Sequence, residues 1–192
     1  FPAAPEDCYA AAREVFRHAG TLGVRPEDIV LIGDSAGGNL AAAVSLMARD
    51  RGEFRPGRQI LIYPALDSRH SEDSPYPSVR ENGTGYLLTA KRVRDYMALY
   101  RSSDEDLTNP YFAPLRASSL ANQPDTLLIT AEYCPLRDEG EAYGRRLREE
   151  GGFVEIHRLP DALHGYFSLP VRFSLVKQTY WIMNRFLERR HE

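Results

Sequence analysis

A serine placed between glycines is the feature of this sequence most suited to chemistry. Ser35 stands in the segment Gly33–Gly38, directly after the apolar run Ile29–Ile32. An apolar strand that ends in G-x-S-x-G and continues as a helix is typical of a nucleophile elbow, in which a sharp turn exposes the serine hydroxyl to a base. Because such a turn crowds the strand against the helix, we expect that only a hydrogen atom fits as the side chain of Gly33 and Gly37.

The amide that follows the serine belongs to the same chemistry. Ala36 N–H would lie at a helix N-terminus, where it can stabilise the negative charge that develops on an oxygen during acyl transfer. Two other interpretations are a glycine-rich turn with Ser35 as the helix N-cap, and a phosphate-binding loop. A P-loop would need a lysine after the last glycine, where this sequence has Asn39. The apolar strand before the motif and the helix after it favour the elbow.

An activated serine needs a base, and five histidines are available. His164 lies on a predicted loop between the last strand and the last helix, on the side of the sheet where Ser35 is expected, and it is the best candidate. The alternative is a surface-loop histidine without a catalytic role. The other four are expected near the end of the first helix, in a long polar loop, inside a strand and in the C-terminal tail: His18, His70, His157 and His191.

Alternating strands and helices must position these residues. Apolar runs predict strands over residues 28–34, 59–66, 126–132 and 153–158. Helical periodicity and capping residues predict helices over residues 5–19, 36–50, 89–100, 138–150 and 171–189. This order predicts an α/β fold with a mostly parallel sheet, right-handed crossovers and helices on both faces. The active site of such a fold lies at the carboxyl ends of the strands.

A polar loop and the helix that follows it are expected to border this site over residues 67–101. Residues 67–85 are rich in Ser, Pro and Gly, and a loop of that length often forms a lid or a binding loop. On the following helix Tyr96 is a candidate for the substrate pocket, although an amphipathic stripe is more often plain core. The last helix is expected to bury one face that carries Phe173, Val176, Tyr180 and Leu187.

Composition narrows the function classes. The chain has 192 residues, of which 43% are hydrophobic, enough for one domain with a core. A net charge of −3 without a long basic block predicts neither a nucleic-acid nor an anionic-membrane partner, and no apolar run is long enough to span a bilayer. The two cysteines, Cys8 and Cys134, form no C-x-x-C motif and favour a reduced, cytoplasmic protein.

Five segments resemble the hormone-sensitive-lipase-type esterases, the bacterial family IV. They are GDSAGGNLA at 33–41, LIYPALD at 61–67, NPYFAPL at 109–115, TAEYCPLRDEGEAYG at 130–144 and DALHGYF at 161–167. The resemblance implies an α/β-hydrolase fold and the hydrolysis of carboxylic esters with short to medium acyl chains, without a metal or an organic cofactor. It matches Ser35 to the nucleophile and His164 to the base.

The acid of this family is replaced. Its place is the first Asp of D-P-L-x-D-E-G, where this sequence has Cys134. A thiol is a weak hydrogen-bond partner and is neutral below its ordinary pKa, so it would hold the imidazole poorly. Three compensations are open: Cys134 is a thiolate beside a charged His164, Asp138 turns toward the histidine, or Asp161 serves. Asp138 has an alternative role at the helix dipole together with Glu139, and Asp161 has one as a turn residue.

The His-Gly-Gly-Gly segment of the family, about four further strands and a cap would all precede Phe1. The resemblance therefore implies that residues 1–192 are the C-terminal portion of one α/β-hydrolase catalytic domain, without the N-terminal strands and the cap. The strand at 28–34 would then be an open edge. We accordingly expect a homo-oligomer or a complementing N-terminal segment.

Two functions are consistent with these residues. The leading hypothesis is a serine carboxylesterase in which Ser35 attacks the ester carbonyl, His164 relays the proton and Ala36 N–H holds the oxyanion. Tyr166 and Phe167 follow the histidine and are expected either to wall the pocket or to pack as core under the loop. The alternative is a catalytically impaired or dead hydrolase-fold protein that acts as a binding or assembly module, an interpretation that the cysteine in the acid position and the lack of an oxyanion segment favour.

Overall fold

Four parallel strands form the centre of the molecule. The computed structural model describes residues 1–189, so the tail histidine, His191, lies outside the described residues. The strands lie in the order β1-β2-β3-β4 and every neighbouring pair is parallel. Their bounds are Val30–Asp34 for β1, Arg58–Ile62 for β2, Asp125–Tyr133 for β3 and Val154–Leu163 for β4. The predicted parallel α/β fold is confirmed.

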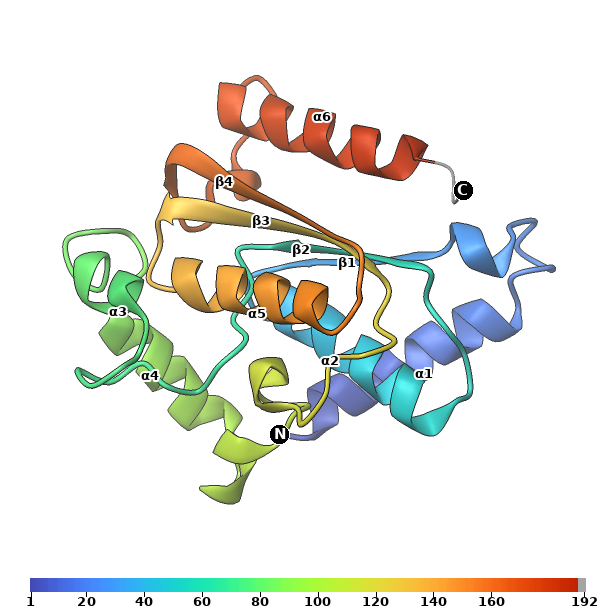
Figure 1. Ribbon diagram of the computed structural model, residues 1–192, viewed down its shortest axis with the longest axis horizontal. Coiled ribbons are helices and arrows are strands. Elements are labelled where there is room, and N and C mark those ends of the chain that lie inside the picture. The colour runs from blue at the N-terminus through green and yellow to red at the C-terminus, as the bar shows by residue number, and fades with distance from the viewer. Residues whose placement is uncertain (190–192) are drawn as a thin grey trace.

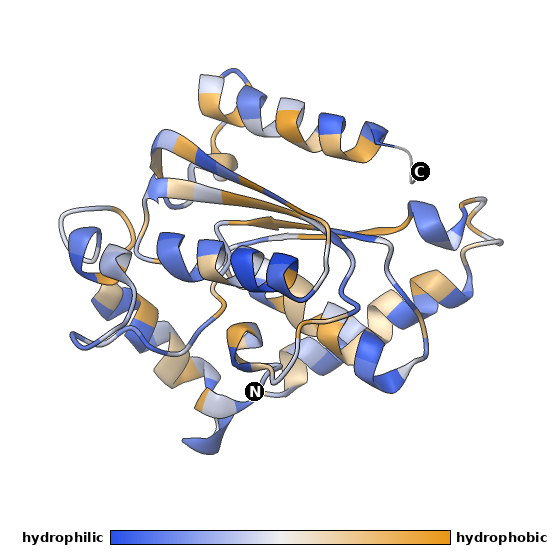
Figure 2. Cartoon of the chain, in the orientation of Figure 1, coloured by the Kyte–Doolittle hydropathy of each residue, from blue (hydrophilic) through white to orange (hydrophobic). Residues whose placement is uncertain are grey.

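Helices cover both faces of this sheet (Figure 1). On one side lie α1 (Ala3–Arg17), α2 (Ala36–Arg51) and α5 (Arg137–Glu149), and on the other lies α6 (Ser174–Glu188). Successive strand residues point to opposite faces. Ile60 packs in the core under α6, whereas its neighbour Leu61 packs with α2 and α5. Figure 2 shows hydrophobic residues concentrated in the strands, with mixed character along the helices.

The segment between β2 and β3 carries the remaining helices. It contains α3 (Pro77–Glu81) and α4 (Ala90–Tyr100). The Thr89 hydroxyl accepts a hydrogen bond from Arg92 N–H and caps α4, as the sequence predicts. The preceding stretch 67–85 is not wholly a loop, because α3 interrupts it. Short 3-10 helices lie at Pro26–Asp28, Glu105–Thr108, Pro114–Arg116 and Tyr166–Ser168.

The buried face of α6 differs from the predicted one. Phe173 precedes the helix and is 42% exposed, and Tyr180 is 43% exposed. Leu187 also lies at the surface, so of the expected face only Val176 is buried. The helix begins later than predicted, and the residues that face the sheet follow Val176 at helical spacing: Thr179, Ile182, Met183 and Phe186.

Strand β1 lies at the edge of the sheet. Ile32 is 50% exposed, whereas Ile60 and Leu61 on the neighbouring strand are buried. An apolar strand with one unpaired edge can pair with another strand. Within residues 1–189, no helix has the length and apolar character that crossing a membrane would require.

Candidate active site

Ser35 occupies a strained turn between β1 and α2. Its backbone has φ 53° and ψ −116°, in the region that side chains rarely adopt. Ser35 N–H donates to Ile62 O at 2.9 Å, and Ser35 O accepts from Asn39 N–H at 3.1 Å and from Ala65 N–H at 3.3 Å. The surrounding backbone therefore holds the strained residue in place, as strain at functional sites requires.

Crowding at this turn involves one expected glycine and one unexpected glycine. A Cβ at Gly33 would lie 2.1 Å from Gly37 O, so no side chain fits there. A Cβ at Gly37 would have its nearest neighbour 4.0 Å away, so the expectation that Gly37 must lack a side chain is wrong. The close approach is at Gly38 instead, where a Cβ would lie 2.8 Å from Pro64 Cβ. The difference arises because Gly37 presents its carbonyl, not its α-hydrogen, to β1.

His164 follows β4 directly and faces the serine. Its Nε2 lies 2.9 Å from Ser35 Oγ. The Tyr63 ring packs 4.7 Å from the imidazole, and the Tyr63 hydroxyl donates to Asp34 at 3.2 Å. Burial lowers the pKa of His164 to about 4, against the opposite pull of the Asp34 charge. At neutral pH the imidazole is therefore uncharged and able to accept a proton.

Cys134 lies on the other side of the imidazole. It follows β3, its side chain is fully buried, and its Sγ lies 3.2 Å from His164 Nδ1. Leu136 N–H donates to the sulfur at 3.4 Å. Burial raises the pKa of the Cys134 thiol to about 12. The sulfur is thus a neutral thiol at physiological pH, which contradicts the thiolate compensation.

A neutral thiol leaves the histidine tautomer open. When Nδ1 carries the proton and donates to Sγ, Nε2 can accept the Ser35 proton. When the thiol instead donates to Nδ1, the proton sits on Nε2 and faces Ser35 Oγ, where it blocks general-base chemistry. An aspartate allows only the first arrangement because a carboxylate cannot donate. Cys134 therefore contacts Nδ1, where the resemblance to the hormone-sensitive-lipase-type esterases implies an acid, without selecting the productive tautomer.

The two residues offered as compensation, Asp138 and Asp161, have other partners. Asp138 accepts from Ser78 N–H at 2.7 Å and pairs with Arg137 at 2.7 Å, and these bonds hold its pKa below the ordinary value despite partial burial. Asp161 lies within β4 and not in the predicted turn: its φ is 58°, beside a register shift between β3 and β4, and its amide donates to Glu132. In residues 1–189 no carboxylate forms a hydrogen bond with His164.

A mainly apolar cavity opens at Ser35 and His164. Its volume is about 540 Å³, within the range of small-molecule sites. Ala36, the first residue of α2, lines it, and early helix amides have no intrahelical acceptor. From the segment expected to border the site come six apolar or aromatic side chains and one arginine that line the cavity: Leu87, Leu88, Val93, Tyr96, Met97, Tyr100 and Arg92.

Two expected pocket residues lie outside this cavity. Tyr166 is buried, hydrogen bonds to Thr179 at 2.8 Å and packs against the edge of Tyr63. Phe167 packs against the same core and against Tyr180. Both residues match the alternative that the sequence left open, core packing under the histidine loop.

The sequence did not identify two residues that support the site, Tyr63 and Asn39. Tyr63 has φ 35° and places its ring against His164. The Asn39 amide donates to Ala65 O and to Phe112 O, each at 2.8 Å. The only signal for Tyr63 was its place in LIYPALD, and Asn39 entered only as the residue that excludes a P-loop. In the part of the chain that the structure describes, no three His, Cys, Asp or Glu side chains converge as metal ligands would.

Comparison with known proteins agrees with this geometry. A family model described as an alpha/beta hydrolase fold matches residues 1–168. An arylesterase of Saccharolobus solfataricus is 38% identical over 88% of this chain and 54% of its own length. An ethyl acetate hydrolase of Pseudomonas putida is 33% identical over 88% of this chain and 52% of its own length. The chain thus spans about half the length of these relatives.

Solved structures give the same result. A hyperthermophilic esterase from the archaeon Pyrobaculum calidifontis superposes with a TM-score of 0.90 at 38% identity, covering 98% of this chain and 61% of that one. EstE1, a thermostable carboxylesterase from a metagenomic library, gives 0.89 at 34% identity, covering 97% and 63%. The chain therefore belongs to the α/β-hydrolase family, and its relatives include carboxylesterases, as its resemblance to the hormone-sensitive-lipase-type esterases predicts.

Proposed function

We propose that this protein is a serine hydrolase that cleaves carboxylic esters of short to medium acyl chain through an acyl-enzyme. The observation that carries the proposal is the 2.9 Å contact between Ser35 Oγ and His164 Nε2, made from a strained turn at the mouth of a cavity. A nucleophile within hydrogen-bond reach of a base is the arrangement that acyl transfer needs. The esterase names of the relatives support the same chemistry.

In the proposed reaction, Ser35 Oγ attacks the ester carbonyl carbon while His164 Nε2 takes the hydroxyl proton. Ala36 N–H donates to the oxyanion of the tetrahedral intermediate. The histidine then gives the proton to the leaving alkoxide oxygen, the C–O bond breaks, and an acyl-enzyme remains. A water molecule, deprotonated by the same nitrogen, attacks the acyl carbon and restores the free serine with release of the acid.

The character of the cavity supports an uncharged, apolar acyl or alcohol group. Leu40, Leu87 and Leu136 line it together with the aromatic and aliphatic side chains of α4. Burial of apolar substrate atoms contributes roughly 25 cal/mol per Å². A volume of about 540 Å³ holds a short to medium acyl chain with a small alcohol.

The residue at the expected acid position, Cys134, supports a second candidate function. Because the Cys134 thiol is neutral, it cannot stabilise the imidazolium that forms when Ser35 loses its proton. This observation favours an impaired hydrolase, or a dead one that serves as a binding or assembly module. On the other side of the imidazole, the 2.9 Å contact between His164 Nε2 and Ser35 Oγ favours the enzyme.

Labelling with a fluorophosphonate probe separates the two functions. We expect the folded protein to form one covalent adduct, which peptide mapping places on Ser35. Ser103, an exposed serine, offers a matched control: Ser103→Ala should label like the parent, and Ser35→Ala should not label. Absence of label on the folded parent would contradict the esterase and support the binding module.

The open edge of β1 is proposed to bind a further strand, from a complementing N-terminal segment or from a second copy of the chain. The half-exposed Ile32 and the position of β1 at the end of the strand order support this. Residues 1–192 alone should therefore be oligomeric or poorly soluble. A stable monomer in light scattering would contradict the proposal.

The two unpaired thiols, Cys8 and Cys134, support a reducing, cytoplasmic location.

A further inference from the structure

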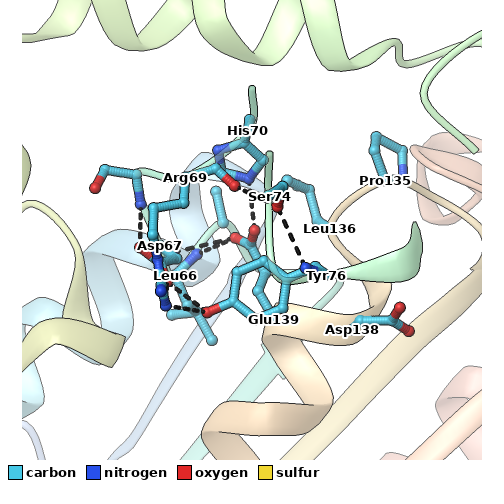
Figure 3. Close-up of polar contacts among 12 residues, drawn as sticks. Leu66, Asp67, Arg69, His70, Ser74, Tyr76, Pro135, Leu136, Asp138 and Glu139 are labelled. Atoms are coloured by element: carbon cyan, nitrogen blue, oxygen red, sulfur yellow. Dashed lines mark hydrogen bonds and ion pairs between the residues drawn. The ribbon is translucent and has the colours of Figure 1, made fainter. Parts of the chain in front are cut away.

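Glu139 does not take the exposed position expected of a carboxylate in the first turn of a helix. The sequence places it beside Asp138 as a charge for the helix dipole, but its side chain is fully buried among the polar residues of Figure 3. Oε1 accepts from Leu66 N–H at 2.7 Å and from Asp67 N–H at 3.2 Å. Oε2 lies 2.5 Å from Nε2 of His70, which is also fully buried.

Glu139 is paired with this histidine. Burial alone would lower the pKa of His70, but the adjacent carboxylate reverses the effect and the pKa lies above its ordinary value. The other buried carboxylate nearby, Asp67, has partners of its own: Arg69 at 2.6 Å, Arg116 at 3.2 Å and the Tyr76 hydroxyl. Glu139 therefore depends on His70 and on two backbone amides, and removal of either side of a buried pair is costly.

On one side this network reaches the backbone beneath the nucleophile. Leu66, which Glu139 holds, follows Ala65 in the chain. Ala65 N–H donates to Ser35 O at 3.3 Å, and Ala65 O accepts from the Asn39 side chain at 2.8 Å. The Leu66 N–H that Glu139 accepts from and the Ala65 carbonyl that Asn39 donates to belong to one peptide group. Glu139 therefore fixes the same peptide that contacts the elbow.

On the other side the network reaches the turn that carries Cys134. Glu139 lies in the first turn of α5, and the chain runs from Cys134 through Pro135 and Leu136 straight into that helix. The polar loop fastens the same turn at two more points. Ser78 Oγ donates to Pro135 O at 2.9 Å, and the Asn82 amide donates to Cys134 O at 3.3 Å. A shift of the start of α5 would therefore move the sulfur relative to the imidazole.

We propose that Glu139 is a positioning residue, which ties the loop behind Ser35 to the turn that carries Cys134 and so fixes the contacts on both sides of His164. The inference rests on the proposed esterase function and adds a residue that touches no substrate. Two buried amides left without an acceptor are costly, so loss of the Glu139 carboxylate should displace the loop. A misplacement of about 1 Å in such a site can cost about 10²-fold in rate.

Two substitutions of similar volume test this role. Glu139→Met removes the hydrogen bonds, whereas Glu139→Gln keeps an oxygen for the Leu66 amide and an N–H for His70. Glu149, exposed on the last turn of the same helix, gives the control Glu149→Gln. We would measure kcat and KM for a short-chain nitrophenyl ester, with kcat normalised to the sites titrated by a fluorophosphonate.

The expected result is a split between kcat and KM. Glu139→Met should lower kcat per titrated site by about tenfold or more with KM within about twofold, while Glu139→Gln and Glu149→Gln stay near the parent. Parental kcat in Glu139→Met would overturn the inference while leaving the esterase proposal intact. Loss of folded sites without a change in kcat per site would overturn it too, because it would show a purely structural role.

Two further measurements keep the inference open to contradiction. If Glu139→Met does not fold, His70→Gln should lower kcat by about threefold or more at unchanged KM, and parental values would overturn the inference. An inactive parent would contradict the proposed function. Hydrogen exchange then decides about Glu139, because Glu139→Gln and the parent should protect the amides of residues 66–67 and those of Cys134 and Leu136 equally. His70→Gln should expose both segments together, and exposure of neither would overturn the inference.

Discussion

The two sides of His164 are built differently. Toward Ser35, an oxygen lies 2.9 Å from Nε2, held by a strained and crowded backbone turn. Toward Cys134, a neutral sulfur lies 3.2 Å from Nδ1, at the end of a strand whose register with β4 shifts between Ala131 and Tyr133, and beside a buried network. Backbone geometry thus places the Cys134 sulfur beside the imidazole although the thiol carries no charge. The comparison shows that the position of a group beside His164 and the charge of that group are separate properties. Substitutions can therefore test the Ser35 side and the Cys134 side of the imidazole independently.

Removal of the nucleophile should have the largest effect. Ser35→Ala deletes a hydroxyl and should lower ester hydrolysis by about 10⁴-fold or more, because no other group replaces the attacking oxygen. The melting temperature should stay at the parental value or rise, since alanine removes no packing. Turnover of a nitrophenyl ester by purified protein, followed with a melting curve, checks both. Unchanged turnover would remove Ser35 from the site.

Crowding at the elbow can be tested at two glycines. Gly33→Ala places a Cβ 2.1 Å from a backbone oxygen and should cost about 3 kcal/mol or more of unfolding free energy, with loss of fluorophosphonate labelling. Gly37→Ala has room and replaces a helical glycine, so it should be neutral or stabilising by up to about 1 kcal/mol. Urea denaturation of both variants decides. Equal destabilisation would contradict the difference between the two positions.

Substitution of Cys134 should raise activity, in contrast to the substitutions at Ser35 and Gly33. Cys134→Asp, in the protein expressed with whatever residues precede Phe1, should raise kcat by about tenfold or more, because a carboxylate fixes the productive tautomer and stabilises the imidazolium. KM should change little, since the gain arises in the transition state. A flat result with an active parent would point to another carboxylate, and Asp138→Asn would be the next variant.

The parent and Cys134→Asp should also differ in the pH dependence of kcat/KM. Because burial lowers the pKa of His164 to about 4, the base stays neutral in mildly acidic solution, and kcat/KM of the parent should fall only as the pH drops through about 4. In Cys134→Asp the added charge favours the imidazolium, so the fall should move to higher pH. Profiles between pH 3.5 and about 8, with circular dichroism as a control for folding, test this. A parental midpoint at 6.5 or above would contradict the lowered pKa.

Local patterns were sufficient for the presence of the four strands and the longer helices and for the chemical types at the site, but not for the short helix α3. The apolar run before Ser35, the glycine before it and the helix after it predict a strand, a turn and a helix because each depends on neighbours in the chain. The cap at Thr89 is equally local. The parallel sheet follows from the alternation of strands and helices.

Predictions failed where a partner from elsewhere in the chain decides. Gly37 and Gly38 exchange roles because Pro64 approaches one of them and nothing approaches the other. Glu139 is predicted as a charge for the helix dipole, whereas the loop after β2 brings His70 and two backbone amides to it. The α6 face depended on where the helix starts against the sheet, which periodicity leaves uncertain by a few residues.

The sequence by itself determined that a serine and a histidine would share one edge of a parallel sheet, and its resemblance to the hormone-sensitive-lipase-type esterases implied that a cysteine stands where that family has an acid. Only the tertiary structure decided that the thiol is neutral, because its pKa depends on burial by residues distant in the chain. Only the tertiary structure brought Tyr63 against the imidazole and Glu139 beneath the elbow. Such contacts depend on how strand-end loops pack against one another, and no local pattern encodes that packing.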